Sequence, residues 1–194
     1  MISIKQIRRL REETGVGPVE CKKALTEAKG DIKKAQEMLR IWGKDFAAEK
    51  TARETKKGIV ESYIHPDSKI GVLLDIRCES DFVAKSKDFK KLAHEICLQI
   101  AAMKPLFLSE KDIPEEFLAG EQKIYQEQFK DSGKPTKIIN EITEGKLKKY
   151  KEEISLLSQP WIKDATKTIK DLIAEHIARI GENIEIKKFV RYNI

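Results

Sequence analysis

The sequence has no long hydrophobic run, and this absence excludes one class of protein. None of its apolar segments approaches the roughly 18 residues that a membrane-spanning helix needs, although 40% of the 194 residues are hydrophobic. The first residues, MISIKQIRRLREE, alternate apolar and basic side chains too closely for the apolar segment of a secretory signal peptide. We therefore expect a cytoplasmic protein.

Cysteine and histidine are also scarce. The three cysteines, Cys21, Cys78 and Cys97, are odd in number and far apart, which argues against a disulfide framework. All three fall at positions that the apolar pattern places inward, where a free cysteine behaves as a small hydrophobe. The three histidines are scattered as well, and no group of His, Cys and acidic residues has metal-ligand spacing. We expect neither a metal site nor a cofactor.

Signatures of catalysis are missing too. TGVGP lacks the spacing and the Lys-Ser/Thr pair of a phosphate-binding loop, and there is no Gly-x-Ser-x-Gly motif. His94 and Cys97 lie three residues apart, but Cys97 belongs to an apolar stripe, which disfavours a nucleophile and base pair. Adjacent acids such as Glu12 and Glu13 fall on predicted helices, where a solvated surface is the simpler interpretation. The pattern favours a binding protein over an enzyme.

What the sequence does have is abundant charge, unevenly placed. Charged residues make up 36% of the chain, and the net charge is +6. Residues 1–57 hold 15 Lys and Arg against 9 acids, whereas the rest of the chain holds 23 of each. A basic region of this kind fits nucleic acid or an acidic protein surface. It fits a merely solvated set of helices equally well.

Residues 1–50 predict a small domain of three helices. Apolar residues recur at helical spacing in three stretches, which TGVGP and the Gly30-Asp31 pair separate. Pro18 suits the first turn of a helix, and Asp31 suits an N-cap. The apolar positions are Ile4, Ile7 and Leu10; Cys21, Ala24, Leu25 and Ala28; and Ile32, Ala35, Leu39 and Trp42. Residues 51–57 keep a high charge and helical propensity, so we interpret them as a helical linker.

Residues 58–194 predict an α+β domain. Alternating apolar residues from Ile70 to Cys78 indicate a strand with one buried face, and GIVESYIH followed by the turn-forming HPDSK completes a hairpin. The tail NIEIKKFVRYNI predicts a third strand with a phase slip near Lys188. Helical patterns cover residues 89–101, 114–131, 135–154 and 169–180, with DSGKP as a break. Helices packed on a small antiparallel sheet of about three strands follow from this order.

The stretch RCESDFVAKS, residues 77–86, places an acid beside an aromatic residue where the strand pattern stops. If the strand continued, Phe82 would point inward, but Ser80 and Asp81 favour turns and helix starts. We therefore expect the chain to turn near Ser80, with Phe82 at a hinge between strand and helix. Since aromatic residues are usually buried, the pattern alone favours packing of Phe82 in its own domain. The alternative is a contact with a partner.

Several segments together resemble one protein family, elongation factor Ts. LREETGVGPVECKKALTEAKGDIKKA is similar to the N-terminal ubiquitin-associated-like helical domain of that family, with GPVEC in place of its frequent Gly-Met-Met-Asp-Cys. CESDFVA resembles its Thr-Asp-Phe-Val signature, with Ser80 in place of Thr. KKLAHEICLQIAAMKP, KLKKYKEEISLLSQPWIKD and IARIGENIEIKKFVR look like further family segments. The resemblance covers essentially the whole chain, in order.

This resemblance implies a guanine-nucleotide exchange factor for elongation factor Tu, with no catalysis of its own. The Asp-Phe-Val loop of the family enters the partner's GTPase domain near Mg²⁺ and the phosphates, and Mg²⁺ coordination is lost. The implied Mg²⁺-displacing residues are Ser80, Asp81, Phe82 and Val83. The implied contacts of the N-terminal domain are Arg11, Val16, Pro18 and Val19, and those of the hairpin tip are Tyr63, Ile64 and His65.

The resemblance also implies how the chain assembles. Longer family members carry the sheet core twice and add a C-terminal module, whereas this chain has one copy, as in the short bacterial or organellar type. Short members form homodimers, so we expect a second protomer to supply the second core. The expected partner is therefore elongation factor Tu, with neither a membrane nor a specific nucleic acid involved.

Two other functions remain open at this level. The basic first domain also suits a nucleic-acid-binding or ubiquitin-associated-like adaptor, although that interpretation assigns no role to Asp81, Phe82 or the second domain. Affinity for RNA that falls steeply with salt would favour it. An enzyme would need a substrate pocket, and the sequence shows no pattern for one.

Overall fold

Three helices open the chain in the computed structural model, which describes residues 2–129 and 135–194. They are α1 (Ile4–Thr14), α2 (Pro18–Glu27) and α3 (Ile32–Lys50). As predicted, Pro18 opens α2 and Asp31 caps α3, since its carboxylate accepts a hydrogen bond from Lys34 N. At the start of α1, Ser3 and Gln6 form a capping box. A small core joins the three helices, and its buried members are Leu10, Cys21, Ala24, Leu25, Ala28, Ala35 and Leu39. The predicted three-helix unit is confirmed.

The helical linker predicted for residues 51–57 is wrong. Helix α3 ends at Lys50, and residues 51–56 form a turn and an irregular segment before strand β1 begins at Lys57. The cause is tertiary, because the Asn183 side-chain amide donates hydrogen bonds to the carbonyls of Thr51 (3.4 Å) and Arg53 (2.8 Å). These contacts hold carbonyl groups that a continued helix would need for its own ladder. A residue 130 positions beyond Arg53 thus overrides the local propensity.

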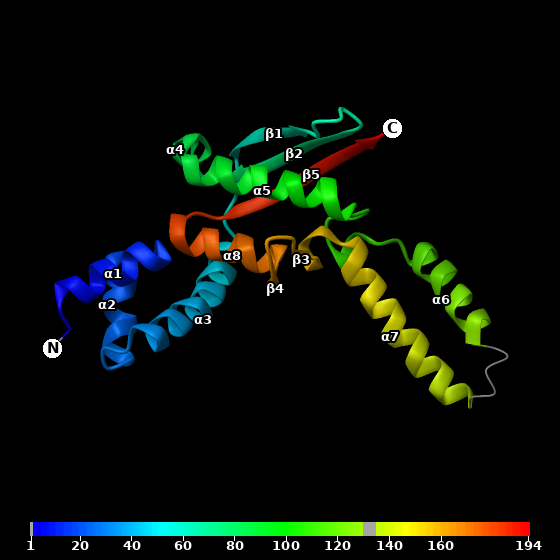
Figure 1. Cartoon of the computed structure of the whole chain (residues 1–194), viewed down its shortest axis with the longest axis horizontal. Helices are drawn as coiled ribbons and strands as arrows, with labels where there is room; N and C mark the ends of the chain where they lie inside the picture. Colours follow the sequence, from blue (N-terminus) through cyan, green and yellow to red (C-terminus); the bar gives the residue numbers. More distant parts are fainter. Residues whose placement is uncertain (1, 130–134) are drawn as a thin grey trace.

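The sheet has three antiparallel strands, as predicted, and their order is β1-β2-β5. They are β1 (Lys57–Ile64), β2 (Ile70–Cys78) and β5 (Ile184–Asn193), with β2 in the centre (Figure 1). The register between β2 and β5 shifts between Asp75 and Ile76, which pair with Lys188 and Ile186. Lys187 is therefore the extra residue of a bulge, one position from the predicted phase slip.

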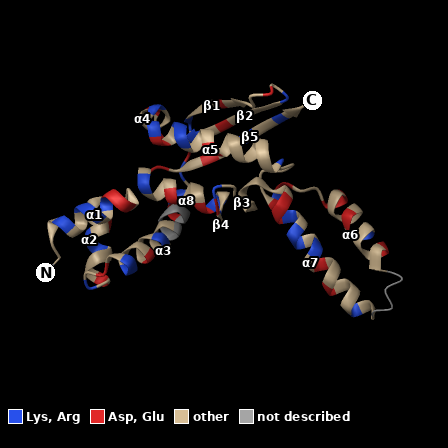
Figure 2. Cartoon of the chain, in the orientation of Figure 1, with Lys and Arg blue, Asp and Glu red and all other residues tan. Residues whose placement is uncertain are grey.

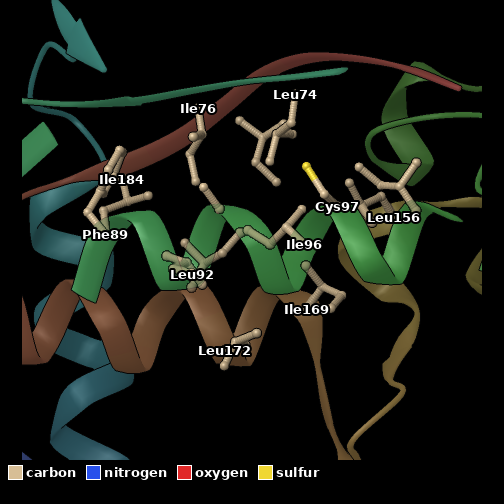
Figure 3. Packing of buried hydrophobic residues seen from close by; sticks show 14 of the residues in the cluster. Leu74, Ile76, Phe89, Leu92, Ile96, Cys97, Leu156, Ile169, Leu172 and Ile184 are labelled. Carbon is tan, nitrogen blue, oxygen red and sulfur yellow. The ribbon is translucent and has the colours of Figure 1, made fainter. Parts of the chain in front are cut away.

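Helix α5 (Lys87–Met103) lies between the sheet and α8 (Ile169–Ile180). Figure 3 shows Leu74 and Ile76 of β2 pointing onto one side of α5, with Ile169 and Leu172 of α8 on the other. Both helices match the predicted apolar stripes, and α3 packs on α8 from outside. The three cysteines are buried, as expected. The layers are thus sheet, α5, α8 and α3, and the division into residues 1–50 and 58–194 stays a prediction.

A helical arm extends away from the sheet (Figure 1). It consists of α6 (Glu115–Phe129) and α7 (Thr136–Ile154), preceded by the 3-10 turn η1 (Glu110–Asp112). Aromatic rings meet at its base, where Phe117 stacks on Tyr150 with centroids 6.2 Å apart. These helices agree with the predicted ones, and all but the last residue of the predicted break DSGKP lies outside the described residues. No helix in the described ranges is long and apolar enough to cross a membrane.

The structure also contains a second, two-stranded sheet, which the sequence pattern does not predict. It follows the turn η2 (Leu156–Ser158) and pairs β3 (Pro160–Trp161) with β4 (Asp164–Thr168). Two fully buried glutamines attach it to α5: Gln99 Nε2 donates to Gln159 Oε1 and to the Pro160 carbonyl, each at 3.1 Å. Because these strands are short and their pattern does not alternate over enough residues, periodicity could not reveal them.

Candidate partner-binding surface

Phe82 points away from the protein. It lies on α4 (Asp81–Lys85), a single short helix between β2 and α5, and its side chain is 86% exposed. The next two residues, Val83 and Ala84, are buried in the main core. The interpretation from pattern alone, which favoured Phe82 as core, is therefore wrong. The chain turns into a helix at Ser80, so strand parity no longer decides which residues face inward.

The helical turn sets the direction of each residue in the loop. The Ser80 hydroxyl caps α4 by accepting a hydrogen bond from Val83 N at 3.3 Å, and the Ser80 carbonyl accepts from Ala84 N at 3.1 Å. Successive helical residues are about 100° apart, so burying Val83 and Ala84 turns Asp81 and Phe82 outward. Of the four implied Mg²⁺-displacing residues, Asp81 and Phe82 form the exposed pair, Ser80 is the cap and Val83 is the anchor.

Asp81 carries its charge into a basic neighbourhood. Its carboxylate lies 3.0 Å from Lys57 Nζ of β1, and both side chains are about half exposed. Lysines also gather along α4 and the start of α5 (Lys85, Lys87, Lys90 and Lys91; Figure 2). An exposed ion pair of this kind contributes about 0–1 kcal/mol. Asp81 can therefore exchange Lys57 for another partner at small cost.

The implied N-terminal contacts surround the turn between α1 and α2. Val16 and Val19 line a groove of about 470 Å³ together with Trp42 of α3 and Gly181 after α8. Arg11 and Pro18 are exposed beside it, at the end of α1 and the start of α2. Gly15 turns the chain with φ of 71°, and a Cβ there would clash with the Arg179 side chain of α8. The turn therefore requires a glycine, and this glycine packs against the Arg179 side chain of α8.

The hairpin tip is separate from the Phe82 loop. Tyr63 and Ile64 end β1 at the far side from α4, which adjoins the Lys57 and Cys78 end of the hairpin (Figure 1). About seven residues of strand separate the two ends, roughly 23 Å at about 3.3 Å per residue. Tyr63 meets the rings of His65 and His94 edge-on, at centroid distances of 6.3 and 5.9 Å. The hairpin tip and the Phe82 loop therefore form separate patches.

The buried titratable side chains are not arranged as a catalytic centre. His176 Nδ1 lies 2.9 Å from the Leu172 carbonyl, and burial lowers the pKa of His176, so it is neutral at pH 7 and fits the predicted core histidine. Burial raises the pKa of Cys97 to about 12, which keeps this thiol protonated. Among the described residues, no three His, Cys, Asp or Glu side chains converge as a metal site.

Sequence reasoning missed residues that only the folded chain brings to the loop. Glu182 contacts Ser80 across 102 residues of sequence, and no local pattern reports such a contact. The open face of the sheet was missed as well, although its residues alternate with the buried ones. Val60, Ile64, Leu73 and Tyr192 are its exposed apolar members. The sequence did contain one signal for this face. On the side of β2 that does not face the core, Leu73 is an apolar residue among polar ones.

Known proteins resemble this chain along its full length. The family model described as Elongation factor TS matches residues 20–194. Elongation factor Ts of Thermosipho melanesiensis is 48% identical over 194 residues, covering 100% of this chain and 99% of the relative. Elongation factor Ts of Thermotoga petrophila is 50% identical over 193 residues, covering 100% and 96%. The chain therefore belongs to the elongation factor Ts family, the nucleotide exchange factors for elongation factor Tu in translation elongation, which are not enzymes.

Proposed function

We propose that the chain promotes GDP release by inserting the Asp81-Phe82 pair into the GTPase domain of elongation factor Tu, near Mg²⁺ and the phosphates. The observation that carries this proposal is an aromatic side chain, 86% exposed, on a capped and anchored helical turn. Aromatic side chains are enriched at protein–protein interfaces relative to the rest of the surface, which fits a contact role for this ring. Ser80 and Val83 support the pair from within the protein, and a cytoplasmic location fits this role.

The energetics are adequate for an exchange factor. GDP is held largely by its phosphates and the accompanying Mg²⁺, so displacing the metal weakens the nucleotide's hold. Burying a Phe side chain in the partner contributes about 1.5–3 kcal/mol toward the Mg²⁺-free state. Linkage then requires that nucleotide weakens binding of the factor by the same amount. New nucleotide therefore releases the factor, and no bond is made or broken.

In this proposal, the other patches contribute affinity for elongation factor Tu and do not themselves displace Mg²⁺. The groove at Val16 and Val19, with Arg11 and Pro18 beside it, offers the GTPase domain an apolar depression bordered by charged residues of both signs. The hairpin tip at Tyr63, Ile64 and His65 lies far enough away to meet another domain of the same partner. In this proposal, contacts at the groove and at the hairpin tip hold the factor on its partner while Phe82 enters the GTPase domain.

Stopped-flow release of fluorescently labelled GDP from the cognate elongation factor Tu tests the proposal. We expect the rate constant for release to rise with the concentration of the wild-type chain and then saturate. Excess Mg²⁺ should reduce the stimulation, because it opposes loss of the metal. An unchanged release rate over the full concentration range would reject the proposal. Steeply salt-dependent RNA binding in its place would favour the nucleic-acid adaptor.

A second part of the proposal concerns a homodimer, which the open face of the sheet supports. Helices α4 and α5 cover one face, while Leu73 at the centre of β2 is 47% exposed on the other. On the same face, Val60 of β1 and Tyr192 of β5 are also exposed apolar residues. Two such faces can pack as a sandwich related by a twofold axis, which gives each protomer the second sheet that it lacks.

Leu73→Lys is expected to convert the dimer to a monomer, because it places a charge at the centre of the proposed interface. Sedimentation velocity at micromolar concentration should give twice the chain mass of 22.3 kDa for the wild type and the single mass for the variant. The matched control is Ile124→Lys on the arm, where an exposed apolar residue receives the same charge. A wild type that sediments as a monomer, or an equal effect of both substitutions, contradicts the proposed interface.

A further inference from the structure

The turn between α8 and β5 holds the Phe82 loop through Glu182. One carboxylate oxygen of Glu182 accepts a hydrogen bond from Ser80 N at 2.9 Å, and the other accepts from Ser80 Oγ at 2.5 Å. Both bonds reach the N-cap residue of α4, two positions before Phe82. A charged acceptor makes such bonds stronger than neutral pairs. Glu182 therefore engages a single residue of the candidate site with both of its oxygens.

Helix α4 needs this support because of its length. It has five residues, and isolated helices shorter than about 12 residues are marginal in water. Its order therefore depends on the burial of Val83 and Ala84 at one end and on the fixed position of Ser80 at the other. The Cys78 thiol adds a weak bond to the Ser80 carbonyl at 3.3 Å. Besides the exposed ion pair of Lys57 with Asp81, Glu182 supplies a charged contact to this segment, and it comes from another part of the chain.

The same turn also forms hydrogen bonds with the segment that follows the N-terminal helices. Asn183, next to Glu182, donates side-chain hydrogen bonds to the Thr51 and Arg53 carbonyls, and its backbone N donates to Glu79 Oε1 at 2.6 Å. Lys50 Nζ donates to the Gly181 carbonyl. Three consecutive residues, 181–183, thus join the end of α3, the end of β2 and the cap of α4.

We propose that Glu182 is a positioning residue for nucleotide exchange, which fixes α4 so that Phe82 faces outward before the partner arrives. This inference rests on the exchange function proposed above and adds the group that prepares its acting loop. A loop that is ordered in advance avoids the entropic cost of ordering when Phe82 enters the already bound partner, the step that sets the maximal release rate. The two oxygens match two donors on Ser80, so glutamine, with one oxygen and an NH₂ group, can satisfy only one of them.

Exchange kinetics of Glu182→Gln and Glu182→Ala test the inference. We expect the maximal GDP-release rate to fall about tenfold in the glutamine variant and further in the alanine variant. The half-saturating concentration should change by less than about twofold, because the groove and hairpin contacts remain. The matched control is Glu144→Gln on the exposed side of α7, which removes a charge without touching the turn. Its exchange rate should equal that of the wild type.

Ser80 provides an independent arm of the experiment. Ser80→Ala removes the hydroxyl that Glu182 accepts from, and Ser80→Thr keeps it, so threonine should restore most of the rate that alanine loses. Ser80→Ala and Glu182→Ala remove one shared bond, so the loss in the double variant should be smaller than the product of the two single losses. Fully multiplicative losses would overturn the proposed contact.

Amide hydrogen exchange separates positioning from general stability and needs no partner protein. In Glu182→Gln, the Val83 and Ala84 amides should exchange at least about fivefold faster, while core amides such as that of Ile96 keep their wild-type rates. Equal acceleration of all these amides overturns the inference. A GDP-release rate of Glu182→Gln equal to that of the wild type overturns it as well. If the wild-type chain itself does not release GDP, the exchange proposal fails first, whereas an active wild type with an unaffected Glu182→Gln variant rejects this inference alone.

Discussion

Phe82→Ala is expected to lower the stimulated GDP-release rate roughly 10- to 150-fold, the range that follows from losing the about 1.5–3 kcal/mol that the buried ring contributes. The same change should alter the free energy of unfolding by less than about 0.5 kcal/mol, since the ring is 86% exposed and supports no core contact. Stopped-flow release with the cognate elongation factor Tu measures the first effect. Urea denaturation measures the second.

Two controls sharpen this result. Phe82→Leu keeps an apolar side chain of smaller size and should retain part of the activity, because partial filling of the partner pocket still buries surface. Ile124→Ala removes a superficial apolar side chain from α6 and should leave both rate and stability unchanged. Full activity of Phe82→Ala, or a loss of stability above about 2 kcal/mol, would show that the ring does not act as an interface wedge.

Phe89→Ala is expected to have the largest effect on stability, a loss of about 3–5 kcal/mol. Phe89 lies seven residues after Phe82, at the start of α5, and is fully buried. Figure 3 shows its ring beside Ile184 of β5, at the end of the core where α5 meets the sheet. Alanine leaves a cavity there that the packed layers can fill only in part. Since small domains are stable by only about 5–15 kcal/mol, this is a large share of the total.

The measurement is the urea midpoint at constant protein concentration, because a dimer would make the midpoint depend on concentration. The slope of free energy against urea should stay close to that of the wild type. Phe89→Leu, which preserves most of the buried volume, should recover more than half of the loss. A midpoint shift for Phe89→Ala no larger than that for Phe82→Ala would contradict the assignment of one ring to the core and the other to the surface.

The elements of the fold follow closely from local chemistry in the sequence. Strict alternation from Ile70 to Cys78 predicts the central strand, and Ser86 and Gly181 mark where α5 begins and α8 ends. Such signals are local because capping bonds and side-chain periodicity involve residues within a few positions of each other. The α+β class, the three-helix start and the three-stranded sheet therefore follow from the amino-acid sequence alone.

Contacts between distant segments cannot be derived in this way. The end of α3 at Lys50 depends on Asn183, and the cap of α4 depends on Glu182, although each pair is separated by more than 100 residues. The short strands β3 and β4 are held by the buried pair Gln99 and Gln159. One sequence alone carries no record of which distant side chains meet, because the hydrogen bonds form only once the layers pack.

Phe82 and Phe89 show this division most clearly. Composition, periodicity and turn chemistry predict which strand and helices flank the two rings. The motif around Phe82 also resembles the signature of the family to which the chain belongs. The direction of each ring came from three-dimensional packing: burial of Val83 and Ala84 turned Phe82 into the solvent, while the sheet closed over Phe89. A hydrophobic side chain has the same intrinsic preference at both positions, so its surroundings in the folded protein determine whether that preference is satisfied within the chain or left for a partner.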